Sequence, residues 1–178
     1  MALSKWTVDP VHSSVEFSIR HMMISRVKGS FDRFSAEIEA DPHDLTTAKI
    51  TFNVDVASIN TANEDRDNHL RSADFFDVEN YPNMTFKATK ITRKSEGVYD
   101  VTGDLTIRGT TRPETFTATF EGVAKDPMGG GEKAGFNIEG EINRSEYGLT
   151  WNAPMETGGV LVSDEVKISI DLQAALED

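Results

Sequence analysis

The four histidines of the chain are its most versatile side chains, since imidazole binds metals and transfers protons near neutral pH. His12, His21, His43 and His69 form neither a His-Glu-x-x-His pattern nor a short metal-binding pair. We therefore predict no metal site. We expect buried, hydrogen-bonded side chains at His12 and His21, and a solvated loop at His43. A site assembled from distant strands by His12, His21 and His69 is the alternative.

A polar cluster lies on the one segment that is predicted to be helical, at residues 62–77. Thr61 and Glu64 stand three positions apart, as the two ends of a capping box do. The helix that they predict carries four polar side chains: Arg66, Asp67, His69 and Arg71. Adjacent residues do not share a helix face, so one of Arg66 and Asp67 is expected to bond a neighbouring loop, such as the turn at residues 9–12. The cluster either pins the helix to the fold or recognises a polar headgroup.

Motifs for covalent catalysis and phosphate binding are absent from the sequence. There is no Gly-x-Ser-x-Gly elbow, and the glycines at 129–131 lack the Lys and hydroxyl residue of a phosphate-binding loop. The absence of cysteine excludes disulfides, thiolate zinc sites and a cysteine nucleophile. Arg108 and Arg144 are expected to pin loops through their forked donors. We therefore expect a protein that is not an enzyme and that needs no cofactor.

Alternating hydrophobicity predicts the elements that position these side chains. Alternation of apolar and polar residues is typical of antiparallel strands with one face on a core. It is clearest at residues 14–20, 50–56, 115–121, 136–141 and 166–172. Further strands are predicted at residues 5–9, 26–40, 84–93 and 98–107, with a bulge or bend at Gly29. Turns are predicted at 95–97 and 126–131, and the tail at 173–178 is expected to form a helix or to fray.

These segments predict an all-β fold in a single domain over residues 1–178. About eight antiparallel strands of this length suit a closed barrel, because closure removes exposed strand edges. Such a barrel is either filled by side chains or holds one ligand, and periodicity does not choose between the two. The helical segment is expected to cover the barrel mouth. Leu70, Phe75 and Phe76 then form the apolar face of a lid, or simply seal the core.

Composition and charge narrow the possible partners. The chain has 178 residues, of which 38% are hydrophobic and 27% charged, as is usual for a globular protein. Its net charge of −12 argues against nucleic acid as a partner and disfavours tight docking on an anionic lipid surface. No window approaches the ~20 apolar residues of a transmembrane helix, so stable membrane insertion is not expected. The first residues lack the apolar run of a secretory signal, so we expect a cytoplasmic protein as given, or a mature form with a new initiator Met.

Four strings of residues closely resemble the YceI-like family of bacterial proteins, in that family's order and spacing. They are DPVHSSVEF at 9–17 with Arg20-His21 after it, RDNHLRSADFFDVENYP at 66–82, GDLTIRGTTRP at 103–113 and INRSEYGLTWN at 142–152. The resemblance runs from Trp6 to about Leu172. It implies a lipocalin-like antiparallel barrel with a long apolar interior.

The resemblance also implies a ligand, namely a long-chain polyisoprenoid lipid, such as the tail of a quinone, for sequestration or transport. Relatives exported to the periplasm and a homodimer are further expectations at the level of the family. Candidate ligand contacts are the inward apolar side chains and two adaptable methionines: Phe17, Ile19, Phe31, Phe52, Val54, Leu70, Phe75, Phe76, Met84, Phe86, Leu105, Phe136, Ile138 and Met155. Ile107 and Ile168 are further inward candidates.

Candidates for a polar headgroup or lid network are His12, His21, Arg66, Asp67 and His69. Two other functions remain open. One is a stress-response or interaction protein with a filled barrel. The other is a barrel enzyme that acts on a lipophilic substrate.

Overall fold

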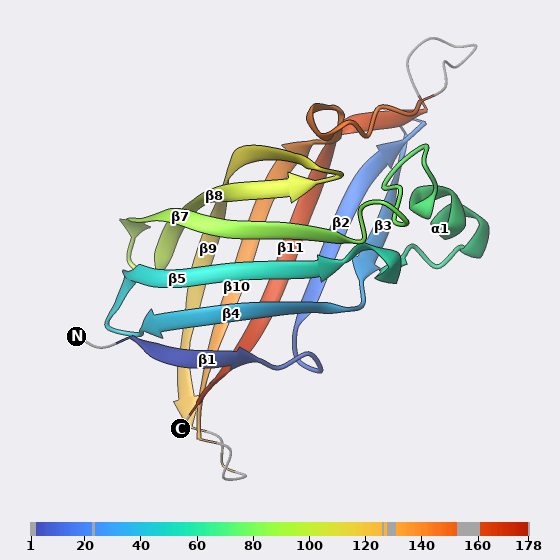
Figure 1. Cartoon of the computed structure of the whole chain (residues 1–178). Helices are drawn as coiled ribbons and strands as arrows, with labels where there is room; N and C mark the ends of the chain where they lie inside the picture. Colours follow the sequence, from blue (N-terminus) through green and yellow to red (C-terminus); the bar gives the residue numbers. More distant parts are fainter. Residues whose placement is uncertain (1–2, 23, 126, 128–130, 153–160, 178) are drawn as a thin grey trace.

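Strands dominate the computed structural model, which describes residues 3–22, 24–125, 127, 131–152 and 161–177 (Figure 1). The strands are β1 (Ser4–Val8), β2 (Ser14–His21), β3 (Ser25–Phe31), β4 (Phe34–Asp41), β5 (Asp44–Asp55), β6 (Ile59–Asn60), β7 (Asn83–Ser95), β8 (Val98–Ile107), β9 (Thr110–Lys125), β10 (Glu132–Asn143) and β11 (Val162–Leu176). The described helical elements are α1 (Glu64–Arg71) and the 3-10 turns η1 (Val56–Ser58) and η2 (Arg144–Tyr147). The predicted all-β fold is confirmed.

Eight of the described strands close into an antiparallel barrel. Their order is β1-β4-β5-β7-β8-β9-β10-β11, and β1 pairs with both β4 and β11, which completes the ring. Closure comes late in the chain, because Val8 at the end of β1 pairs with Ala174 near the end of β11. The predicted barrel is therefore confirmed, and the tail continues β11 to Leu176 instead of forming a helix or fraying.

One end of the barrel is extended by a second set of strands. The first part of β11 pairs with β2, from Val162 opposite His21 to Asp171 opposite Ser14, while its last part pairs with β1. β3 then pairs with β2, and β6 adds two residues to β3. Figure 1 shows β2 and β3 on the side of the molecule that carries α1. This end is therefore bordered by the β2–β3 hairpin and by the helical segment.

The prediction of a single strand over residues 26–40 is wrong. The chain turns at Asp32 and Arg33, where both backbone N–H groups bond to Ser58, one to its carbonyl and one to its hydroxyl. Arg33 also pairs with Asp55 at 2.8 Å. These contacts come from residues more than twenty positions away, so no local sequence pattern predicts the break between β3 and β4.

Gly29 does not form the predicted bulge or bend, but lies where two side chains come close to the backbone of β3. It pairs in unbroken register opposite Phe17. A Cβ atom at this position would lie less than 3.0 Å from the Phe17 ring and from the Thr61 methyl group. Glycine is therefore required because side chains from β2 and from the α1 segment pack onto the strand backbone.

The helix begins two residues later than the capping-box prediction. Asn63 is the N-cap, and its side chain accepts a hydrogen bond from the Arg66 backbone N–H at 3.0 Å. Ala62 has a left-handed φ of 63°, which reverses the chain ahead of this cap. A turn follows Ser72, with Phe75 N–H bonded to the Ser72 carbonyl. Among the described residues, no helix is long and apolar enough to cross a membrane.

Candidate functional site

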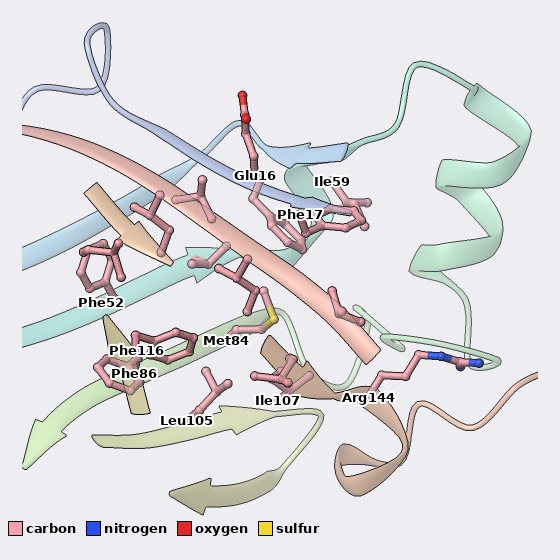
Figure 2. A pocket seen from close by; sticks show the side chains of 18 of the residues that line it. Glu16, Phe17, Phe52, Ile59, Met84, Phe86, Leu105, Ile107, Phe116 and Arg144 are labelled. Atoms are coloured by element: carbon pink, nitrogen blue, oxygen red, sulfur yellow. The ribbon is translucent and has the colours of Figure 1, made fainter. Parts of the chain in front are cut away.

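The interior of the barrel holds a cavity of about 660 Å³. Its walls are almost entirely aliphatic and aromatic side chains that point inward from the strands (Figure 2). A volume of this size lies within the range of about 300–1,000 Å³ that is usual for small-molecule sites. The barrel is therefore hollow, which the sequence periodicity left open.

The two ends of the cavity differ in chemistry. The end at which β5 begins is packed by buried residues of several strands, among them Trp6, Leu45 and Ala174. The other end lies beside α1, and there the lining becomes polar. Its polar residues include Thr61, Asn63, Asp65, Arg66 and His69, joined by His21 and Arg144. An elongated guest would therefore meet apolar walls along its length and polar groups at one end.

Glycines in the walls allow large rings to lie flat, so that the space inside stays open. Gly140 on β10 faces the cavity, and a Cβ atom there would lie less than 3.0 Å from the Phe116 ring on β9. Phe116 in turn meets Phe86 edge to face, with ring centroids 5.3 Å apart, and the two are neighbours in Figure 2. Because Gly140 has no side chain, the Phe116 ring lies against the β10 backbone and does not extend into the lumen.

The predicted apolar contacts converge on this cavity. The described members of the set all line it: Phe17, Ile19, Phe31, Phe52, Val54, Leu70, Phe75, Phe76, Met84, Phe86, Leu105, Phe136 and Ile138. Ile107 and Ile168 line it as well. Met155 lies outside the described residues. That these side chains touch a ligand stays a prediction.

Arg66 and Asp67 form a structural network around Thr61. The Thr61 hydroxyl donates to the buried Asp67 carboxylate at 2.5 Å and accepts from Arg66 Nε at 2.8 Å. Asp67 also accepts from the Thr61 backbone N–H at 2.9 Å. The expected bond to the turn at residues 9–12 is wrong, because both side chains turn back onto Thr61. Arg66 nevertheless lines the cavity.

His12 lies away from the mouth network to which it was assigned. It sits before β2 and bonds Asp9 at 2.7 Å, with 62% of its side chain exposed. That hydrogen bond is the main reason why the pKa of Asp9 is lowered. Since His21 ends the eight-residue strand β2, the strand separates the two histidines by its whole length. His12 is therefore exposed, not buried as expected, and does not belong to the polar network at the mouth of the cavity.

His21 and His69 both line the cavity. His69 bonds Asp74 at 2.9 Å, and its ring meets Trp151 and Phe75 edge to face at centroid distances of 4.8 and 5.1 Å. Within the described part of the chain, no group of three or more His, Asp or Glu residues is arranged to hold a metal ion.

Arg144 lines the cavity, a position that the sequence did not predict for it. It is 3% exposed and donates to the carbonyls of Leu149, Trp151, Val162 and Ser163, as the loop-pinning hypothesis expected. Burial lowers its pKa, which the more distant Asp164 partly offsets. Its place at the cavity edge, visible in Figure 2, depends on contacts between η2 and β11.

Tyr147 on η2 fills the gap that opens where β9 and β10 part. It is fully buried, and its hydroxyl donates to Glu114 at 2.9 Å. Burial, reinforced by the Glu114 carboxylate, raises the pKa of this phenol well above its usual value. The residue was not predicted, because its role exists only where two strands of the barrel diverge.

Comparisons with known proteins agree on one family. Residues 6–174 match the YceI-like domain. A UPF0312 protein of Staphylococcus epidermidis is 43% identical over 176 residues, which cover 99% of this chain and 100% of the relative. The crystal structure of Burkholderia cenocepacia BcnA aligns with a TM-score of 0.83 at 27% identity, covering 94% of this chain and 99% of BcnA.

A more distant structure shares the fold. It is a polyisoprenoid binding domain from Saccharophagus degradans, described as implicated in plant cell wall breakdown. It aligns with a TM-score of 0.73 over 98% of this chain and 99% of its own, at 14% identity.

Proposed function

This chain belongs to the YceI-like domain family, and on that premise we propose that it binds a long-chain lipid inside its barrel, with a polyisoprenoid as the preferred class. The observation that carries the proposal is the 660 Å³ cavity, whose walls are largely apolar and which has a cluster of polar residues at the α1 end. The polyisoprenoid named in the description of the Saccharophagus domain supports the class of ligand.

Hydrophobic burial supplies the affinity for the tail. Each 100 Å² of apolar surface removed from water contributes about 2.5 kcal/mol. The same tail in a bilayer is already out of water, so transfer from membrane to barrel gains little from this effect. Selection among lipids must then come from tail shape and from contacts with the headgroup.

Tail shape is selected by a stiff aromatic wall. Phe17, Phe31 and Phe76 form a chain of ring contacts at one end, with centroids 5.4 and 6.0 Å apart. Rings have few rotamers, so they present fixed recesses between them. We expect a branched prenyl tail, with methyl groups at regular intervals, to fit such recesses better than a straight acyl chain does.

The headgroup lies at the α1 end in this proposal. Arg66 donates from Nε to the Thr61 hydroxyl and from one terminal nitrogen to the Thr61 carbonyl. Its other terminal nitrogen has no hydrogen bond to a described residue. His69 stands beside it on α1, with one ring nitrogen on Asp74. Arg66 therefore supplies a donor to a polar group held above the tail. His69 donates Nε2–H to the Asp74 carboxylate, so its other ring nitrogen is an acceptor when the ring is neutral.

A substitution that fills the lumen tests the proposal. Ala118 on β9 is 7% exposed and lines the cavity, so Ala118→Trp places an indole in open space without displacing the wall. We expect native mass spectrometry of detergent-free protein to find a co-purifying lipid in the wild type and little or none in the variant. A fluorescent prenyl probe should bind one to one in the wild type only.

The matched control is Thr117→Trp, one position along the same strand and on its opposite face. It should retain both the lipid and the probe, and both variants should unfold at wild-type denaturant concentrations. Equal lipid loading in Ala118→Trp and Thr117→Trp would place the guest outside the barrel and refute the proposal.

A further inference from the structure

The tip of the β2–β3 hairpin exposes apolar side chains at the edge of the cavity. Ile24 is 83% exposed and Met22 is 44% exposed. The preceding residue, His21, lines the cavity, and the Met22 backbone N–H bonds the carbonyl of Leu161, which also lines it, at 2.7 Å. The exposed tip therefore adjoins the polar end of the cavity, where a guest would enter.

Cations stand directly behind this tip. Arg20 on β2 and Arg26 on β3 are exposed and lie directly opposite each other in the antiparallel register. Lys28 follows on the same exposed face, two residues beyond Arg26. Like charges in opposite positions destabilise a strand pair, and none of the three side chains has a hydrogen bond or ion pair to a described residue. The arrangement is unfavourable for the isolated protein, and an external anion would relieve it.

We propose that this tip, defined by Met22 and Ile24 with Arg20, Arg26 and Lys28, docks the protein on the surface of an anionic phospholipid bilayer. The two apolar side chains enter the interfacial region, and the three cations bond lipid phosphates. Shallow apolar insertion combined with a few cations is the usual basis of reversible attachment to a membrane surface. The docked orientation turns the cavity mouth toward the bilayer.

The net charge of −12 does not prevent this attachment. Charges more than about 8 Å from the membrane are largely screened at physiological ionic strength, so the residues around the tip decide the local field. The exposed carboxylates nearest to it in the register are Glu16 on β2 and Asp164 and Glu165 at the start of β11. Glu64 and Asp65, on the first turn of α1, are also exposed, and Asp65 lines the same cavity as His21. These carboxylates weaken the attachment, which fits a protein that leaves the membrane again.

A bilayer suits this surface better than a second copy of the chain. Two tips placed face to face would bring the arginines of both copies together without a counter-ion. An anionic surface neutralises the same groups. The inference concerns the outside of the barrel, and only its biological purpose, the exchange of a lipid guest, rests on the proposed function.

Sedimentation with vesicles tests the docking. We expect the wild type to bind vesicles of phosphatidylcholine mixed with phosphatidylglycerol, less so at high salt, and to bind pure phosphatidylcholine weakly. Met22→Asn combined with Ile24→Ser should lower the partition coefficient about tenfold, because it removes the inserted apolar groups. Asn is chosen at position 22 because Met22 has a left-handed φ of 54°. Arg20→Gln combined with Arg26→Gln should lower it about fivefold for each charge, on anionic vesicles only.

The chain offers matched controls for both pairs. Val11 is 83% exposed, as Ile24 is, but precedes β2 at the end away from the tip, so Val11→Ser should leave partitioning unchanged. Lys90 and Arg93 are exposed cations on β7, and Lys90→Gln with Arg93→Gln should have no more than the small effect of net charge.

Equal partitioning of the tip variants and the controls would overturn the proposal. So would a change in the sedimentation of the tip variants without vesicles, because the tip would then be a contact between copies of the chain. The prenyl probe, added without vesicles, separates this result from the proposed function. Tip variants should bind the probe normally, and a wild type that partitions but binds no probe would refute the lipid guest and leave the docking intact.

Discussion

At the scale of single residues, Arg144 joins two segments that border the cavity. Its guanidinium bonds four carbonyls, two from residues 149–151 and two from residues 162–163. A buried cation normally needs an anion, but Asp164 is 3.9 Å away and more than half exposed. The four backbone carbonyls are therefore the main groups that stabilise the buried charge of the Arg144 guanidinium. This explains how a largely apolar cavity tolerates a guanidinium at its edge.

Replacing Arg144 should cost far more than replacing a similar arginine elsewhere. Arg144→Met leaves four carbonyls without their donor, and we expect a loss of about 2–4 kcal/mol in the free energy of unfolding. Arg108→Met is the matched control, because Arg108 bonds two carbonyls, those of Ala73 and Gly148, at a more exposed position. It should lose about 1 kcal/mol. Equal losses in urea titrations would contradict the role assigned to Arg144.

Tyr147 should make the fold sensitive to alkali. Its pKa is raised in the folded state by burial and by Glu114, whereas the unfolded chain ionises near pH 10. The folded state then keeps a proton that the unfolded state loses, so stability is full below pH 10 and falls above it by up to about 1.4 kcal/mol per pH unit.

The Tyr147→Phe variant should lose this part of the pH dependence. Tyr81→Phe, at a residue that is 37% exposed, should retain it. Unfolding free energies measured between neutral pH and pH 11 would check both. A wild-type slope in Tyr147→Phe would assign the alkaline loss to another group.

At the scale of elements, the pairing of β9 with β10 determines how much of the lumen stays open. Gly140→Ala should drive the Phe116 ring off the wall and into the cavity, because the added Cβ would overlap it. We expect a loss of about 1–3 kcal/mol in stability and weaker binding of the prenyl probe. Calorimetry and probe titration measure the two effects.

Gly135→Ala on the same strand is the control, since its Cβ would meet only the Glu121 Cβ, at 3.6 Å. This variant should be neutral or slightly stabilising. If both alanine variants behaved alike, the close approach at Gly140 would not be what keeps the lumen open.

At the scale of the whole molecule, the barrel is asymmetric along its axis. β1, β4 and β11 close one end around Trp6, whose indole N–H donates to the Ala40 carbonyl at 3.3 Å. At the other end β2 and β3 continue the wall beyond the closed ring, and α1 lies against it. Arg71 holds the helix there by bonding the carbonyls of Ala57 and Ile59. We therefore expect the proposed guest to exchange at the α1 end, which is also the end of the exposed hairpin tip.

The sequence alone was sufficient to predict most of the strands, apart from the break between β3 and β4, and to predict which side chains face inward. Period-two alternation fixes which side chains of a strand face the same way, and this is a local property of each segment. For that reason Phe52, Phe86 and Ile138, far apart in the chain, were correctly assigned to one interior before any pairing was known. Family resemblance, and not periodicity, supplied the expectation of a hollow interior.

Tertiary structure alone decided the cavity and its mouth. Whether a barrel is filled depends on how rings from one strand pack onto the next, as Phe116 does on Gly140. The break between β3 and β4 depends on Ser58, and the place of Arg144 depends on carbonyls up to 19 residues away. Asn63, and not the predicted Thr61, caps the helix, because the Thr61 hydroxyl is bonded to Asp67 and Arg66. Such contacts join residues that no local pattern relates, so only the folded chain brings them together.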